Sequence, residues 1–318
     1  MIARQPAYRV IAAGLLVWAL CVTGSARAAR GATPGMVTVP GAPRCPIFPA
    51  SNVWNRDISR LPVAANSARM IAAIGLDRGL HPDFDTNPDD GIPYVVVSGR
   101  QPTVTVGFDY ADESDRGPYP IPPHPPIEGG GAGDSHVLIV DRDACRLYEL
   151  YATHHTTRGW RAGSGAIWDL RSNALRPDGG TSADAAGLPI LPGLARYDEI
   201  ARGAIMHALR FTAPRTRRAH LYPARHDAGD GDDPSLPPMG LRVRLKASVD
   251  IARFSSQARV VLRALRRYGM LLADNGSPWY ISGAPDPRWD DDGLHALGRI
   301  TGRDLEVVDT ASLRNGRY

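Results

Sequence analysis

Lysine is almost absent from this chain of 318 residues, in which Lys246 is the single lysine. A Schiff-base mechanism therefore has one candidate nucleophile. The sequence also lacks a Lys/Arg-rich stripe that could follow phosphate groups. Residues 1–28 contain three arginines and no acid, so without them 34 basic and 33 acidic residues remain and the net charge falls from +4 to +1. Charge therefore gives no reason to expect a nucleic-acid partner.

Several common catalytic motifs are also missing. No HExxH, P-loop or GxGxxG between strand and helix occurs, and the serine of Ala162–Ala166 lacks both outer glycines of a GxSxG elbow. The acidic runs 109–115 and 227–233 do not have the DxDxDG spacing of a calcium loop. Nucleotide and zinc-protease chemistry are therefore unsupported, and we expect no cofactor. A zinc or copper site built from separated histidines is the alternative that spacing leaves open.

Long apolar runs are limited to Val10–Gly24, about 15 residues, which is shorter than the roughly 20 needed to span a bilayer. Arg4 and Arg9 precede this run, and the small-x-small sequence at 26–28 follows it. This order is typical of an export signal. We therefore predict a signal peptide over 1–28, a secreted or periplasmic location and no stable membrane span, with an uncleaved anchor as the alternative.

Cysteine is scarce, with three in the chain. Cys21 falls in the expected signal peptide, which leaves Cys45 and Cys145 as a pair. In an oxidising compartment such a pair persists as a disulfide. Metal ligation or a nucleophilic cysteine is the alternative, but neither residue lies in a CxxC motif or near a histidine in sequence.

Short runs rich in β-branched and aromatic residues, bounded by Gly, Pro, Asn and Asp, dominate the rest of the chain and predict strands. Helices are expected at 66–75, at 256–268 and near Leu294. We therefore predict a mainly β fold with a few helices, a β-sandwich or jelly-roll-like single domain over 50–318 after a flexible lead-in at 29–49. The strands are expected at 93–97, 103–108, 136–141, 147–151, 206–212, 220–223, 241–245, 270–273, 279–282 and 305–308.

Four carboxylates in loop-rich surroundings are candidate catalytic acids. The candidates are Glu128, Asp169, Asp184 and Asp274. Apolar or small neighbours could raise the pKa of Asp184 and Asp274 enough for acid catalysis. The alternative for each is local: Asp184 can cap a short helix, and Asp274 begins an Asp-Asn-Gly turn.

His207 is a further catalytic candidate, because alternation along a strand would place it on a face that is otherwise apolar. A buried, hydrogen-bonded core histidine is the alternative. His136, at the start of its expected strand, and His226 are two more candidates. Aromatic rings beside Gly, Ser and Asp could stack on sugars, and an arginine could hold a charged group. The substrate-binding candidates are Trp160, Trp168, His136, Tyr222, Arg225 and Tyr280.

Six blocks of sequence resemble a group of uncharacterised secreted bacterial proteins. The resemblance covers roughly Cys45 to Asp309, which implies a single domain, and it carries no activity to transfer. The blocks are Ile127–Gly130, His136–Asp141, Ser164–Pro177, Thr181–Ile190, His207–Phe211 and Ala273–Gly276.

The acids and aromatic residues together predict an enzyme acting on polysaccharide or oligosaccharide, foremost a glycoside hydrolase that uses paired carboxylates. A polysaccharide lyase, in which a His or Tyr abstracts a proton beside a carboxylate held by Arg225, is a second hypothesis. A carbohydrate-binding or envelope protein is the non-enzymatic alternative. Gly133–Ser135 with Asp292–His295 also resembles the GDS and DxxH blocks of GDSL-type esterases, although the GxND block is missing. The sequence does not indicate an oligomeric state.

Overall fold

The continuous apolar run at 137–141 forms β4 (Val137–Asp141), a strand that is buried on both faces. Leu138 and Val140 pack into the main core, whereas Val137 and Ile139 pack into a second, smaller core. Burial on both sides explains why the strand lacks alternation of apolar and polar residues. β4 belongs to a four-stranded sheet with the order β2-β4-β5-β8. Its other strands are β2 (Tyr94–Val97), β5 (Arg146–Tyr151) and β8 (Ser164–Asp169).

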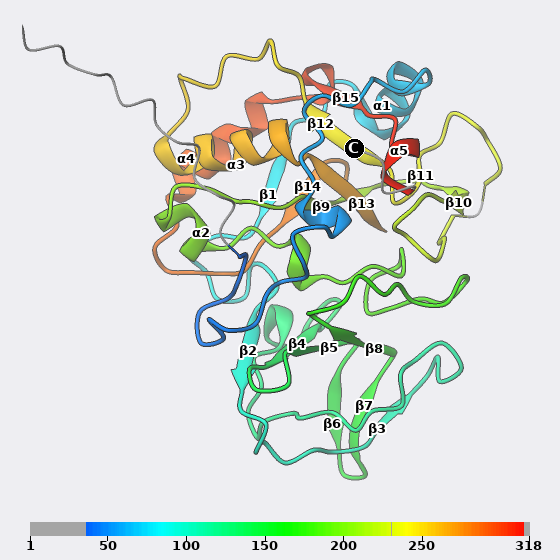
Figure 1. Cartoon of the computed structure of the whole chain (residues 1–318), viewed down its shortest axis with the longest axis vertical. Helices are drawn as coiled ribbons and strands as arrows, with labels where there is room; N and C mark the ends of the chain where they lie inside the picture. Colours follow the sequence, from blue (N-terminus) through cyan, green and yellow to red (C-terminus); the bar gives the residue numbers. More distant parts are fainter. Residues whose placement is uncertain (1–35, 230, 315–318) are drawn as a thin grey trace, which may run out of the picture. The chain divides into compact units, whose positions relative to one another are not determined.

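A six-stranded sheet with the order β1-β14-β9-β13-β12-β15 forms the centre of the main core. Two of its strand pairs, β1·β14 and β9·β13, are parallel. In Figure 1 this sheet lies in the upper half and the four-stranded sheet in the lower half. The strands of the larger sheet are β1 (His81–Asp83), β9 (Leu209–Ala213), β12 (Arg242–Leu245), β13 (Met270–Asn275), β14 (Tyr280–Ser282) and β15 (Leu305–Val307).

Two smaller sheets complete the strands of the part that the computed structural model describes, residues 36–229 and 231–314. One has the order β3-β7-β6 and covers the outer face of the four-stranded sheet through the second core. The other pairs β10 with β11. Their strands are β3 (Val106–Phe108), β6 (His154–Thr156), β7 (Gly159–Ala162), β10 (Arg217–His220) and β11 (Pro238–Met239).

Helix α3 (Ser256–Arg267) shows how the helices join the core. The side chain of Ser255 caps its N-terminus by accepting from the amide of Ala258. Val261 and Leu265 lie on its buried face, while Arg263 and Arg267 are exposed. The other helices are α1 (Ser67–Gly75), α2 (Tyr197–Ala201), α4 (Asp291–His295) and α5 (Ala311–Arg314), with 3₁₀ turns at Val53–Asn55, Glu128–Gly131, Leu191–Gly193, Ala296–Arg299 and Gly302–Asp304.

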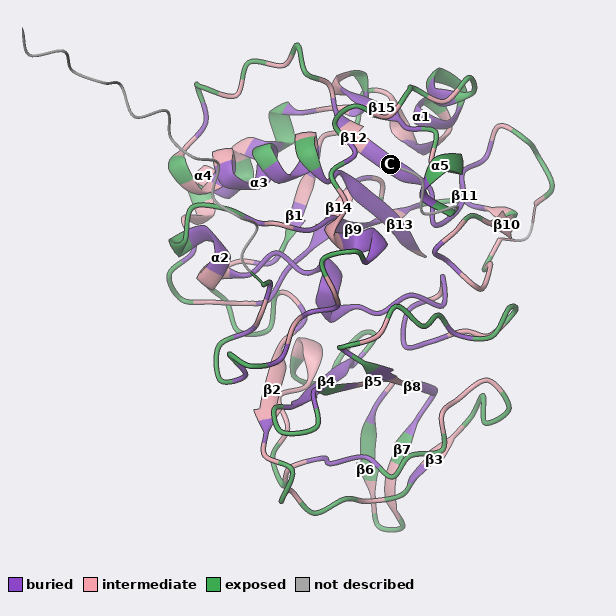
Figure 2. Ribbon diagram, in the orientation of Figure 1, coloured by how far each residue is buried: buried purple, intermediate pink, exposed green. Residues whose placement is uncertain are grey.

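The mainly β composition with few helices is confirmed, and most expected strands are present within one or two residues. A jelly-roll is not confirmed, because the described strands divide among four sheets and include parallel pairs. Figure 2 shows the burial that results: β9 and β13 are largely buried, and β6 is exposed. The predicted signal peptide at 1–28 lies outside the described residues.

The segment 36–49, the described part of the expected lead-in, packs against the main core. Val39, Ala42 and Ile47 are buried in the main core, and the amide of Ile47 donates to the carbonyl of Val37. The apolar residues in this Gly/Pro-rich stretch therefore anchor it to the fold. The expected disulfide between Cys45 and Cys145 is present, with Cα atoms 5.2 Å apart.

Replacing both cysteines by serine is expected to lower the free energy of unfolding by about 2–4 kcal/mol, because the bond closes a long loop in the unfolded chain. Urea denaturation of the two proteins would measure the difference. Reduction of the wild type should produce a similar loss, and neither thiol should react with a maleimide before reduction. Rapid labelling of the unreduced protein would contradict the bond.

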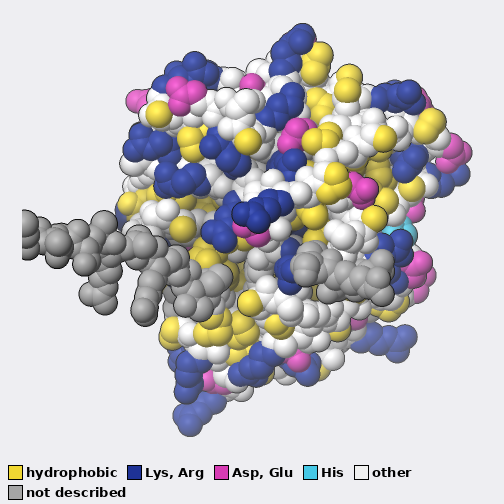
Figure 3. Space-filling model, turned by 45° about the horizontal axis from the view of Figure 1, so that its top comes forward, with side chains coloured by type: hydrophobic (Ala, Val, Ile, Leu, Met, Phe, Trp, Pro, Cys, Tyr) yellow, Lys and Arg dark blue, Asp and Glu magenta, His cyan; other side chains and the backbone are white. Residues whose placement is uncertain are grey.

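Arginine is spread over the surface. On the face shown in Figure 3, basic side chains are scattered among apolar and acidic ones and form no single stripe. None of the helices in the described ranges is both long and apolar enough to cross a bilayer.

Candidate functional site

A cleft of about 440 Å³ lies where the six-stranded and four-stranded sheets approach each other. β5 and β8 contribute Tyr151 and Ser164, which face each other in register, and β13 contributes Asp274 from the other sheet. Loops supply the remaining wall. The lining residues are Tyr110, Glu113, Asp134, Tyr151, Ser164, Thr181, Ser182, Ala183, Asp184, Ala185, His226, Asp274 and Asn275.

Asp274 occupies the carboxyl end of β13, where the strand leaves the core. Four buried residues, 270–273, precede it, and a register shift after Leu272 places it opposite Thr212 in the parallel strand β9. Carboxyl ends of parallel strands share one edge of a sheet, a common place for ligand sites. Burial, followed by the neighbouring Asp184 carboxylate, raises the pKa of Asp274 to about 7, although Arg210 and His136 act in the opposite direction.

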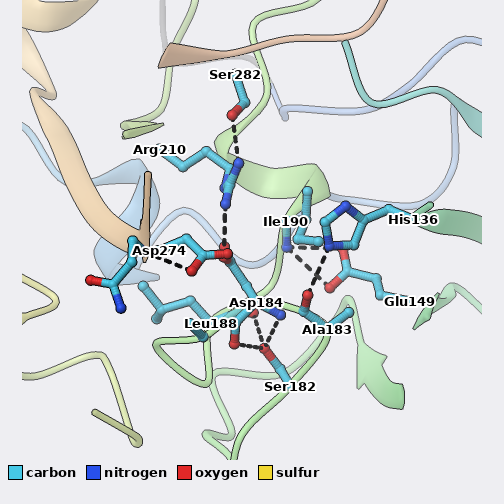
Figure 4. Close-up of polar contacts among 12 residues, drawn as sticks. His136, Glu149, Ser182, Ala183, Asp184, Leu188, Ile190, Arg210, Asp274 and Ser282 are labelled. Atoms are coloured by element: carbon cyan, nitrogen blue, oxygen red, sulfur yellow. Dashed lines mark hydrogen bonds and ion pairs between the residues drawn. The ribbon is translucent and has the colours of Figure 1, made fainter. Parts of the chain in front are cut away.

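Asp184 is also in the cleft wall, but its charge is already paired. Both carboxylate oxygens accept from Arg210, at 2.7 and 3.0 Å, and Asp184 is 1% exposed. Arg210 in turn donates to the hydroxyl of Ser282 at 2.5 Å. Figure 4 shows Arg210 between Ser282 and Asp184, with Asp274 beside them. The pair therefore sets the charge environment of Asp274 and does not itself supply a free acid.

Ser182 fixes the loop that carries Asp184. Its hydroxyl accepts a hydrogen bond from the amide of Asp184 at 2.9 Å and donates one to the carbonyl of Leu188 at 2.6 Å. The hydroxyl of Ser164 in β8 donates to the carbonyl of Ser182 at 2.6 Å. These bonds tie the cleft wall to the four-stranded sheet, so the loop is part of a fixed framework.

Behind this wall, the buried His136 pairs with the partly buried Glu128. The ring Nδ1 of His136 lies 2.5 Å from Glu128 Oε2, and its Nε2 lies 2.9 Å from the carbonyl of Ala183. Burial alone would lower the pKa of His136, but the Glu128 carboxylate outweighs it and raises that pKa. Both ring nitrogens face acceptors, so the protonated ring fits the site. His136 therefore supports the wall through Ala183 and does not face a ligand.

Glu149 in β5 is a buried acid that sequence reasoning missed. It accepts from the amides of Ile190 and Leu191 and from the indole of Trp168, at 2.9–3.1 Å. Burial raises the pKa of Glu149 to about 7. Alternation in β5 gave a signal, since Glu149 lies on the same face as Leu147, but its partners are distant in sequence.

Glu113, Asp134 and Tyr110 were also missed, because they lie in loops without a periodic pattern. Glu113 Oε2 accepts from the amide of Thr181 at 3.1 Å, and Tyr110 is 56% exposed on the cleft. Tyr151 is a further residue of the cleft lining that the sequence did not indicate. No sequence signal links these residues to Asp274, since only the tertiary fold brings them together.

His207 is not at the cleft, and its assignment to a strand face is wrong. β9 begins two residues later, at Leu209. The ring is fully buried and contacts Glu199 in α2 at 3.0 Å and the carbonyl of Ala208 at 2.7 Å. The alternative reading, a hydrogen-bonded core histidine, is correct. Helix α2, which supplies the partner, was not expected from the sequence.

Two of the four candidate acids lie away from the cleft. Glu128 is committed to His136. Asp169 is exposed at the end of β8 and accepts from the amide of Arg171 at 2.9 Å. Asp184 and Asp274 are the two that the structure brings together in the lining.

None of the six substrate-binding candidates lines the cleft. Trp168 is 5% exposed and donates to Glu149, and Trp160 packs edge-on against His155. Tyr222 packs against the main core, while Arg225 binds the carbonyl of Arg176 and the carboxylate of Asp178. Tyr280 packs against His81, with the two rings tilted, in a separate surface groove of about 390 Å³, and His136 is buried behind the wall. Each of these six side chains packs against, or hydrogen-bonds to, a residue that its neighbours in the sequence did not indicate.

The two remaining alternatives from the sequence are a metal site and the serine nucleophile of an esterase. Among the described residues, no group of three or more His, Cys, Asp or Glu side chains could hold a metal ion. The hydroxyl of Ser135 has long contacts, 3.4–3.5 Å, to the carbonyls of Gly133 and Ala132. A nucleophilic serine would need a histidine ring at that hydroxyl.

The chain matches no family model, and neither a curated protein nor a solved structure matches it.

Proposed function

We propose that this protein is a secreted glycoside hydrolase acting on an uncharged polysaccharide, with Asp274 as the general acid. One observation carries the proposal: a carboxyl whose pKa is about 7 lies in a cleft that other carboxylates also line. At neutral pH a substantial fraction of Asp274 is protonated and can donate to a departing glycosidic oxygen. Glycosidases require such an acid together with a second acidic or basic group.

The charge of the lining favours a neutral substrate. Glu113, Asp134, Asp184 and Asp274 are the carboxylates in the cleft, and the described lining residues include no arginine or lysine. A uronic acid would find no exposed cation to hold its carboxylate. This makes a lyase acting on uronates less favoured, and Arg225, its expected anchor, is engaged with Asp178.

The shape and chemistry of the walls suit a sugar. Tyr110 and Tyr151 offer aromatic surface with a polar edge, on which the C–H face of a pyranose can stack. Asn275 and Thr181 add polar groups that can bond hydroxyls. The Cys45–Cys145 disulfide supports the extracellular or periplasmic location in the proposal, because such bonds persist in oxidising compartments.

A panel of neutral, uronate-containing and amino-bearing polysaccharides, incubated with purified protein, tests the proposal. We expect new reducing ends on a neutral glycan, and product masses that include the added water. Products with near-ultraviolet absorbance would indicate a lyase instead. Binding without any turnover would identify a carbohydrate-binding protein and reject the enzyme.

A further inference from the structure

His226 lies in the same cleft as Asp274 and is held in one tautomer. Its Nδ1 is 2.7 Å from the carbonyl oxygen of Ala185. A carbonyl can only accept, so Nδ1 carries a hydrogen and the neutral ring has its lone pair on Nε2. The backbone amide of His226 also donates, to the carbonyl of Ala186 at 3.2 Å.

Glu113 is the acid nearest to Nε2 among the ion pairs of His226. Its Oε2 lies 3.9 Å from His226 Nε2, which is too far for a direct hydrogen bond and suits one bridging water. The amide of Thr181 holds the same oxygen, and Arg176 donates to the backbone carbonyl of Glu113 at 2.7 Å. Two groups that can take a proton from water are therefore fixed on one wall by backbone contacts.

We propose that His226 is the general base, and that Glu113 positions the attacking water beside it. The inference rests on the proposed hydrolase function and specifies its mechanism. The water oxygen bonds to the anomeric carbon and its proton moves to His226 Nε2. The glycosidic C–O bond breaks, and the leaving oxygen takes the proton of Asp274. Direct attack by water is a single displacement, so the product has the inverted anomeric configuration.

The arrangement requires no covalent intermediate. His226 and Asp274 serve as base and acid in the same step, and transfer of a proton from His226 to Asp274 through solvent restores both. Loss of a general base is expected to reduce kcat by about 10²–10⁴-fold. His226→Ala and His226→Gln should show this loss with a KM close to that of wild type.

The matched control is His220→Gln. His220 lies near His226 in sequence but binds Asp178 at 3.1 Å and is not part of the cleft lining. It should retain the kcat of wild type. Imidazole added to His226→Ala should restore part of the activity, because a small base can enter the space that the ring leaves. A merely structural role would not give this rescue.

Proton NMR of the first product, recorded before mutarotation, tests the stereochemistry on whichever glycan the wild type cleaves. Inversion, loss of kcat in both His226 variants and rescue by imidazole support the inference. Retention of configuration, or wild-type kcat in either folded variant, overturns it and leaves the hydrolase standing. Circular dichroism checks the fold of each variant. A wild type that cleaves no glycan overturns both proposals.

Discussion

Asp274→Asn is expected to lose activity and gain stability in the same protein. Removing the general acid should reduce kcat by about 10²–10⁴-fold. The folded state binds the Asp274 proton more tightly than the unfolded chain does, because the pKa rises from 3.8 to about 7 on folding. Wild-type stability therefore falls as the pH rises from about 4 to about 7, then stays level with respect to this group.

The size of the gain follows from that pKa difference. The full pKa difference corresponds to about 4 kcal/mol in the free energy of unfolding. Because Asp274 is partly exposed on the cleft, we expect a gain on the order of 2 kcal/mol at pH 8 and almost none at pH 4. Urea denaturation at the two pH values measures it. Asp77→Asn, which removes an exposed surface acid paired with Arg303, is the control and should change neither kcat nor the free energy of unfolding. Equal stability of Asp274→Asn and wild type at pH 8 would argue against a raised pKa.

The same titration governs catalysis by the wild type. Because Asp274 acts in its protonated form, kcat/KM should decline about tenfold per pH unit above pH 7. Asp184, Arg210 and His136 are the charged groups that act on Asp274 from the elements around it.

Much of the fold could be predicted from the local sequence pattern, because short apolar runs are buried whichever elements they pack against. The strand at 270–273 and the helix at 256–268 were recognisable in this way, and both are present. β6 and β7 were not expected, since Gly159–Ala162 has few strand-forming residues and β6 is largely exposed. The order of the strands in the sheet could not be predicted either, because the pairing of β9 with β13 joins residues more than 50 positions apart in the sequence.

The site was predictable only where neighbours in sequence set the environment. Asp274 follows four apolar residues, so burial of its carboxyl could be expected from the sequence itself. Asp184 has small neighbours too, but its state depends on Arg210, 26 residues away. His207 was misplaced because its partner Glu199 belongs to a short helix without a clear signal. Pairing across the fold, which local composition does not encode, decided the outcomes for Asp184 and His207.

Arg210→Met should be among the most destabilising single substitutions in the cleft region. It leaves the Asp184 carboxylate buried, at 1% exposure, without its cation. Breaking a buried ion pair in this way typically costs about 3–5 kcal/mol. Urea denaturation at pH 7 measures the loss. Arg303→Met breaks an exposed pair with Asp77 and should cost less than about 1 kcal/mol. A similar cost for both variants would contradict the importance of burial.

The double variant Asp184→Leu with Arg210→Met separates the pair from its surroundings. Replacing both charges removes the unpaired carboxylate, so much of the lost stability should return, and the cycle of single and double variants gives the coupling energy. Asp184 raises the pKa of Asp274 and Arg210 lowers it. In Asp184→Asn the alkaline limb of kcat/KM should therefore move to lower pH, whereas in Arg210→Met it should move to higher pH. Opposite shifts in these two variants would identify Asp274 as the titrating acid, and the absence of any shift would assign that limb to another group.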